Sequence, residues 1–194
     1  MKLVFATHNQ NKFQEVKNLV PTSVELVSLR DIGCYNEIPE TGKTLEENAQ
    51  IKADFVTSTY GLPSFSDDTG LLVNALNGAP GVYSARYAGA DKNANANMDK
   101  LLEELHAIGD RSARFETVIA LNLNSGCHFF KGVVHGSITK EKKGKKGFGY
   151  DPIFQPKGYD KTFAELPMEQ KNGISHRAKA MKQLVDFLAT LTNS

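Results

Sequence analysis

Cysteine is scarce in this sequence, with only Cys34 and Cys127 among 194 residues. These two cysteines lie far apart and form no spacing typical of a metal site. The residues that follow the N-terminal methionine become polar too early for a signal peptide. We therefore expect a cytoplasmic protein whose thiols stay free in a reducing compartment.

Long apolar runs and a strong charge of one sign are also missing. No apolar run approaches 18 residues, so the sequence predicts no transmembrane helix and no membrane partner. A formal net charge of +1 argues against a dedicated nucleic-acid surface. The hydrophobic fraction of 40% and the charged fraction of 23% are ordinary for a globular protein. The length fits one domain, residues 1–194, with a sizeable core or two intimate lobes.

The most unusual stretch is residues 64–73, in which Asp67 and Asp68 stand between apolar residues and just before Thr69-Gly70. Buried carboxylates cost free energy unless a partner compensates them. The usual partner of such a pair at a strand end is a divalent cation or a proton in acid–base catalysis. In an extended chain, neighbouring side chains point to opposite faces, so one aspartate would face a given site. The alternative interpretation is a solvated turn.

A polar segment, residues 7–12, joins a predicted strand (residues 2–6) to a predicted helix. Helix N-termini favour phosphate groups because their backbone N–H groups and the helix dipole attract anions. Lys12 near the helix start would oppose the dipole, so a bound anion would explain it. An ordinary strand–turn–helix with an asparagine cap remains the alternative.

Thr44 and Glu47 have the spacing of a capping box, which predicts a long helix that ends at about Tyr60, before Gly61. Lys52 falls on the apolar stripe of this helix. A lysine there either extends to solvent or meets an anion. Further on, the sequence predicts a helix over residues 97–108 and two long hairpin strands over residues 113–123 and 128–139.

Residues 147–154 form the second unusual stretch, in which Gly147 and Gly149 frame Phe148. Glycine allows the backbone to approach a ligand closely, and an aromatic ring held there suits stacking on a flat base. A β-bulge before a strand is the alternative. The lysine-rich segment that precedes it, residues 140–146, is interpreted as a solvated loop, with a triphosphate clamp as the less favoured reading.

Ser175 is a good N-cap for the last helix, and His176 and Arg177 follow in its first turn. Acidic residues would stabilise the first turn of a helix, so two cationic or donor groups there favour a ligand with acceptor atoms.

The unusual residues of the chain fall into three groups, according to the part of a ligand that each could bind. Phosphates could be held by Thr7, Asn9, Lys12 and Lys52. A hard cation such as Mg²⁺ could be held by Glu40, Asp67 and Asp68. A base could be stacked on Phe148, and its edge could be recognised by Asp151, Lys171, His176 and Arg177. A nucleotide hydrolase or transferase needs these three groups of residues.

In their order and residue types, these motifs resemble the inosine triphosphate pyrophosphatase family, also called dITP/XTP or non-standard purine nucleoside triphosphate pyrophosphatases. The matching segments are residues 7–12, 40–49 with Lys52, 66–71, 78–87, 147–152 and 175–177. Each motif is weak alone, but six in order over almost the whole chain are highly specific.

The resemblance implies an α/β fold: an elongated, two-lobed domain with a long mixed β-sheet flanked by helices and a central active-site cleft. It also implies a homodimer. The implied activity is Mg²⁺-dependent hydrolysis of ITP, dITP and XTP between the α and β phosphates. The products are the monophosphate and pyrophosphate, and the nucleotide pool is kept free of deaminated purines.

The family's motifs imply roles for particular residues of this chain. Asp68 would be the general base, and Glu40 and Asp68 would bind Mg²⁺. Substrate binding would involve Thr7, His8, Asn9, Gln10, Asn11, Lys12, Lys52, Thr69, Phe148, Gly149, Tyr150, Asp151, Lys171, His176 and Arg177.

Two rival interpretations remain open. A pyrophosphatase with a broader nucleotide range, including pyrimidines, would keep the Asp-Glu-Lys chemistry and lose base selectivity. Phe148, Asp151, His176 and Arg177 argue against it. A non-catalytic nucleotide-binding protein would have no need of Glu40 and Asp68, so their presence disfavours that reading.

Overall fold

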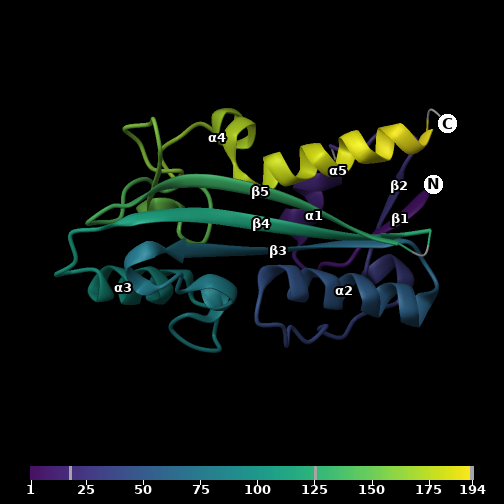
Figure 1. Cartoon of the computed structure of the whole chain (residues 1–194), viewed down its shortest axis with the longest axis horizontal. Coiled ribbons are helices and arrows are strands. Elements are labelled where there is room, and N and C mark those ends of the chain that lie inside the picture. The colour runs from purple at the N-terminus through teal and green to yellow at the C-terminus, as the bar shows by residue number, and fades with distance from the viewer. Residues whose placement is uncertain (18, 125, 193–194) are drawn as a thin grey trace. The chain divides into compact units, whose positions relative to one another are not determined.

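The computed structural model describes residues 1–17, 19–124 and 126–192. Helices and strands alternate along most of the chain (Figure 1). The helices are α1 (Gln10–Lys17), α2 (Leu45–Tyr60), α3 (Ala94–Glu104), α4 (Met168–Ile174) and α5 (His176–Thr192). The strands are β1 (Lys2–Phe5), β2 (Glu25–Ser28), β3 (Ser64–Val73), β4 (Ser112–Leu123), β5 (Gly126–Ile138) and β6 (Phe154–Pro156). Short 3-10 helices lie at Arg30–Ile32, Asn74–Leu76, Gly81–Arg86 and Asp151–Ile153.

The strands form one sheet in the order β2-β1-β3-β4-β5-β6. Strand β1 pairs in parallel with both β2 and β3, whereas β5 and β6 are antiparallel. The predicted α/β class and the mixed sheet with flanking helices are therefore confirmed.

The chain divides into two compact units, each with its own apolar core. In unit 1, Phe5 stacks on Phe65, with ring centroids 4.5 Å apart. In unit 2, Phe115 and Phe154 pack edge to face within the core. Unit 1 comprises Met1–Asp68, Thr117–Gly132 and Lys179–Ser194, and unit 2 comprises Thr69–Glu116 and Val133–Ala178.

Helix α2 begins and ends where the sequence predicts. The Thr44 hydroxyl accepts a hydrogen bond from the Glu47 N–H at 3.1 Å, and the Glu47 carboxylate accepts one from the Lys43 N–H. Gly61 ends the helix in the left-handed conformation, at φ 64°. These local bonds satisfy end groups that the helix itself leaves open, which is why the sequence located both ends.

Strand β3 contains the aspartate pair in its interior rather than at a strand end or in a turn. Residues 64–73 form one continuous strand, and Asp67 and Asp68 are buried within it. The turn alternative is therefore wrong. The strand continues because charged and polar groups from α1 and α2 compensate both carboxylates, which the local sequence does not reveal.

Two other boundaries differ from the predicted ones. Helix α3 begins at Ala94, capped by the side chain of Asn93, and ends at Glu104 rather than at Ile108. Apolar residues beyond its end still pack in the core as turns, which explains why the helical pattern extended too far. The predicted hairpin strands formed as β4 and β5, whereas Ser125 of the predicted turn lies outside the described residues.

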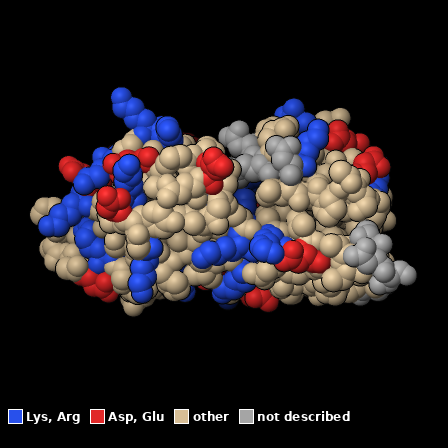
Figure 2. All heavy atoms as spheres, turned by 90° about the horizontal axis from the view of Figure 1, so that it is seen from above, with Lys and Arg blue, Asp and Glu red and all other residues tan. Residues whose placement is uncertain are grey.

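None of the described helices combines the length and the apolar character needed to cross a membrane. On the face drawn in Figure 2, basic and acidic side chains are interspersed with uncharged surface.

Candidate active site

Asp67 and Asp68 of β3 point to different helices of unit 1. The Lys12 ammonium of α1 lies 3.0 and 2.9 Å from the two carboxylate oxygens of Asp67. The Asp68 carboxylate instead faces α2, from which Asn48 donates a hydrogen bond at 3.2 Å. The alternation along an extended strand therefore holds, and each aspartate serves a different neighbour.

Lys52 joins the acidic groups of this cluster. Its ammonium lies 2.6 Å from Glu40 Oε1, 2.8 Å from the carbonyl oxygen of Asp67 and 3.8 Å from Asp68 Oδ1. Burial disfavours the charged form of Lys52, but the charges of Asp68, Glu40 and Asp67 outweigh that effect and raise its pKa. Lys52 is therefore a permanent buried cation, able to stabilise a phosphate.

The Asp68 carboxyl has a pKa above its ordinary value. Burial is the largest cause, while the positive charge of Lys52 acts in the opposite direction. Glu40 raises this pKa further, and Lys12 and Asn48 lower it. Burial therefore makes the Asp68 carboxylate more basic than an exposed aspartate, which favours its acceptance of a proton.

Asn48 is a residue of this cluster that the sequence analysis missed. Its side chain is 0% exposed and bonds both to Asp68 and to the backbone N–H of Gly42. One signal was available: Asn48 lies three residues after Leu45 and four before Lys52, on the same helical stripe. A polar residue at a stripe position requires a buried partner.

The polar segment before α1 folds back on itself. The Asn9 side chain accepts a hydrogen bond from the Lys12 N–H at 3.2 Å, and the Thr7 hydroxyl accepts one from the Asn9 N–H at 3.2 Å. Asn9 therefore caps α1, as the alternative interpretation expected, and this capping leaves Lys12 directed at Asp67.

The remaining predicted residues of this segment have different surroundings. His8 Nε2 lies 2.8 Å from the carbonyl oxygen of Asn36, to which it can donate. Gln10 is the first residue of α1 and is exposed. Asn11 belongs to the same helix, but its side chain lies outside the described part of the structure.

Unit 2 carries a second cluster, built around Asp151 and Lys171. Their side chains are buried and form an ion pair of 2.5 Å. The same Asp151 oxygen accepts a hydrogen bond from the Phe148 N–H at 2.8 Å. A Cβ on Gly147, which has φ +78°, would lie 2.0 Å from that oxygen, so only glycine fits there.

Phe148 is 46% exposed, although its backbone N–H is held by Asp151. The Lys171 ammonium lies 5.0 Å from the ring centroid, and the Arg177 guanidinium lies 5.6 Å from it. These distances are those of cation–π contacts. An exposed ring beside two cations can stack on a flat heterocycle that carries acceptor oxygens.

His176 is buried in the same unit, stacked on Phe115 with centroids 4.7 Å apart. The Tyr150 hydroxyl donates to the carbonyl oxygen of Ser84 at 2.8 Å, and burial raises the pKa of this phenol. Gly149 takes φ +62°, and Thr69 is half-buried on β3. Contacts of these residues with the substrate stay predictions.

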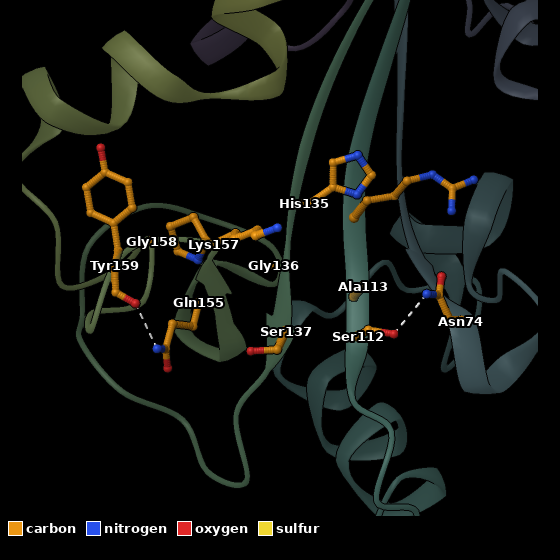
Figure 3. Close-up of a pocket in the computed structure, with 12 residues that line it drawn as sticks. Asn74, Ser112, Ala113, His135, Gly136, Ser137, Gln155, Lys157, Gly158 and Tyr159 are labelled. Atoms are coloured by element: carbon orange, nitrogen blue, oxygen red, sulfur yellow. Dashed lines mark hydrogen bonds between the residues drawn. The ribbon is translucent and has the colours of Figure 1, made fainter.

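A pocket of about 470 Å³ also lies in unit 2, against β4, β5 and β6 (Figure 3). In Figure 3, Asn74 bonds to Ser112 on one side of the pocket, and Gln155 bonds to the backbone at Tyr159 on the other. The residues that line it include none of the predicted site residues.

Within the described residues, the structure thus joins predicted residues into two groups, one in each unit. In unit 1, Lys12 pairs with Asp67, and Lys52 pairs with Glu40 and Asp68. A hydrogen bond from Lys52 to the backbone carbonyl of Asp67 joins these ion pairs. An α/β fold with a buried lysine–carboxylate cluster and a cation-flanked aromatic ring defines a nucleotide-handling class of protein.

Sequence comparison gives the family. The chain belongs to the Ham1 family, whose model matches residues 3–187. It is 58% identical to the dITP/XTP pyrophosphatase of Christiangramia forsetii over 97% of this chain and 100% of the relative. It is 57% identical to the dITP/XTP pyrophosphatase of Flavobacterium johnsoniae over 97% of this chain and 98% of the relative.

Structural comparison agrees. The solved structure of the Staphylococcus aureus Ham1 protein matches with a TM-score of 0.93 and 41% identity, over 98% of this chain and 99% of that chain. The family resemblance predicted from the sequence is therefore confirmed.

Proposed function

We propose that this protein hydrolyses deaminated purine nucleoside triphosphates, namely dITP, ITP and XTP, to the nucleoside monophosphate and pyrophosphate. The observation that carries the proposal is the cluster of Lys12, Lys52, Glu40, Asp67 and Asp68 in unit 1, in which Lys52 and both aspartates are buried. Relatives more than 50% identical over nearly their whole length bear the name of this activity.

The residues of unit 1 suit attack at the α-phosphorus. Asp68 takes a proton from water as the new P–O bond forms and the bond to the departing pyrophosphate breaks. Lys12 and Lys52 stabilise negative charge on the triphosphate and on the leaving group. The charge of Lys52 also favours the ionised form of Asp68 that a base requires.

Mg²⁺ is the proposed cofactor, and the donor set fits it. Among the described residues, no group of three or more histidine, cysteine or acidic side chains is placed to hold a metal ion by itself. Mg²⁺ in phosphoryl-transfer sites is typically held by one or two carboxylates, with substrate phosphates and waters as the other ligands. Glu40 and Asp68 would hold it, and it would supply charge neutralisation on the phosphates.

Base selection is assigned to unit 2. Hypoxanthine and xanthine present an acceptor oxygen at C6, whereas adenine presents an amino donor there. Donors from Lys171, His176 or Arg177 would face that amino group without an acceptor. Each such mismatch costs about 1–3 kcal/mol, or roughly tenfold to a hundredfold in rate. Two such mismatches would make ATP a poor substrate.

The proposal includes the wider predictions of the sequence. The whole chain acts as one domain of two lobes, forms a homodimer, works in the cytoplasm and removes deaminated purines before polymerases incorporate them. Neither nucleic acid nor a membrane is a proposed partner.

The experiment is pyrophosphate release from dITP, ITP, XTP, ATP, GTP and CTP, each with and without Mg²⁺. Fast, Mg²⁺-dependent release from the first three and little from the others is expected. Comparable release from all six nucleotides would show that the enzyme accepts a broad range of nucleotides and does not select the base. No release from any would remove the catalytic proposal.

A further inference from the structure

Helix α2 runs alongside strand β3 (Figure 1). A regular series of polar contacts joins the two elements in unit 1. The Ser64 hydroxyl donates to the carbonyl oxygen of Ala53 at 2.8 Å, and the Ser66 hydroxyl donates to that of Ala49. Two residues of a strand span about 6.6 Å, and four residues of a helix span about 6.0 Å. The spacing of the two serine hydroxyls along β3 therefore matches the spacing of the two carbonyl oxygens along α2.

The next step of the series reaches Asp68, where α2 has almost come to its N-terminal end. Asn48 makes this contact with its side chain, through the amide Nδ2 that donates to Asp68 Oδ2 at 3.2 Å. The other end of the same amide, Oδ1, accepts from the Gly42 N–H at 2.8 Å. A carboxylate only accepts and an N–H only donates, so these partners fix the orientation of the amide.

Gly42 is held close against α2. A Cβ at Gly42 would lie 2.8 Å from Asn48 Oδ1 and 2.7 Å from the Cβ of Glu47, so a larger residue requires the contact to open. Gly42 stands two residues after Glu40. Asn48 therefore ties the segment that carries Glu40 to the helix that faces Asp68.

We propose that Asn48 is a positioning residue for the hydrolysis. Its one amide holds the Asp68 carboxylate on one side and the Glu40-bearing segment on the other, so that both acidic groups keep their places relative to α2. The inference rests on the proposed function for the reaction that it serves. Misplacing a reacting group by about 1 Å can cost roughly a hundredfold in rate.

Two variants separate the two ends of the amide. Asn48→Leu removes both hydrogen bonds while keeping the number and branching of the side-chain heavy atoms. It should lower kcat for dITP roughly tenfold to a hundredfold and speed hydrogen exchange of the Gly42 amide at least about tenfold. Asn48→Asp keeps an oxygen for the Gly42 N–H but loses the amide donor to Asp68. It should lower kcat similarly while Gly42 exchange stays within about threefold of the unmodified protein.

Asn122→Leu is the matched control. Asn122 also donates to an aspartate of α2, with Nδ2 2.7 Å from Asp54 Oδ1 and 3.4 Å from Thr57 Oγ1. Neither of these partners belongs to the candidate site. This variant should leave both kcat and Gly42 exchange unchanged.

A kcat within about threefold of the unmodified protein in Asn48→Asp would overturn the proposal, and so would unchanged Gly42 exchange in Asn48→Leu. If Asn48→Leu does not fold, the kcat of Asn48→Asp decides. If the unmodified protein releases no pyrophosphate, the proposed function fails instead. Gly42 exchange in Asn48→Leu then decides whether Asn48 holds this segment.

Discussion

Two buried lysines, one in each unit, show how neighbours determine what the same side chain can do. Lys52 and Lys171 are each 8% exposed, and each lies about one hydrogen-bond length from a carboxylate. Lys52 is surrounded by further acidic groups and a backbone carbonyl. Lys171 has one carboxylate and lies over two aromatic rings, at 5.0 Å from Phe148 and 5.7 Å from Phe163.

From this difference, we expect the two lysines to serve different parts of the proposed reaction. A cation among several carboxylates is typical of a site for proton transfer, because each charge shifts the proton affinity of its neighbours. A cation beside exposed aromatic surface belongs to a site that recognises a flat, polar ring. Unit 1 should therefore control kcat, and unit 2 should control which base is accepted.

The sharpest test of this division is Asp68→Asn. Asparagine can still accept the hydrogen bond from Asn48, so the fold should persist, but it cannot take a proton. We expect kcat for dITP to fall about 10²- to 10⁴-fold, while the dITP-to-dATP ratio of nucleotide affinities is retained. Measurements are single-turnover pyrophosphate release and nucleotide binding by calorimetry. A kcat close to that of the unmodified protein would remove Asp68 from the role of base.

Lys52→Gln removes the central cation of unit 1 while keeping a hydrogen-bond donor. We expect kcat to fall about 10²-fold because charge on the departing pyrophosphate loses its stabilisation. The pH dependence gives a second readout. Burial raises the pKa of Asp68 and Lys52 lowers it, so loss of Lys52 raises this pKa further. The acid limb of the kcat–pH profile should therefore move to higher pH, and a shift to lower pH would contradict the assignment.

Phe148→Ala tests the aromatic half of the comparison. Stacking of a base on an aromatic ring contributes about 1–3 kcal/mol, so KM for dITP should rise roughly tenfold or more, with a smaller change in kcat. Tyr83→Ala is the control, because Tyr83 is an exposed aromatic residue of the same unit at 59% exposure. The measurement is KM and kcat for dITP from steady-state kinetics. Equal effects of the two variants would contradict a role of Phe148 in stacking on the base.

Lys171→Gln is the counterpart of Lys52→Gln, with the smallest expected effect. Glutamine can still donate to Asp151, so the backbone at Phe148 should stay in place. We expect the ratio of kcat/KM for ITP over ATP to narrow by roughly tenfold, while kcat for ITP changes little. If Lys171→Gln lowers kcat as much as Lys52→Gln does, the division of work between the units is wrong.

The sequence predicts α2 well because the signals for it are local. Thr44, Glu47 and Gly61 make contacts within a few residues, and no other part of the chain is needed to interpret them. The family resemblance was accessible for a similar reason, because its motifs consist of contiguous residues.

The sequence could not establish the surroundings of the aspartate pair. Whether Asp67 and Asp68 end a strand or lie inside one depends on Lys12, Asn48 and Lys52, which are distant in sequence. Asp151 illustrates the same limit. It was predicted to read the base, yet one of its oxygens is engaged by Lys171 and the Phe148 N–H. Long-range hydrogen bonds of this kind leave no periodic signal in the chain.

The contacts between α2 and β3 have an evolutionary consequence. Ser64 and Ser66 are completely buried, and their hydroxyls reach backbone carbonyls of the helix. A bulkier side chain at either position would push the helix outward, and Asn48 and Lys52 would move with it. Positions 64 and 66 should therefore accept few replacements in a library of random variants selected for activity. Tolerated changes there should be accompanied by compensating changes at positions 49 and 53.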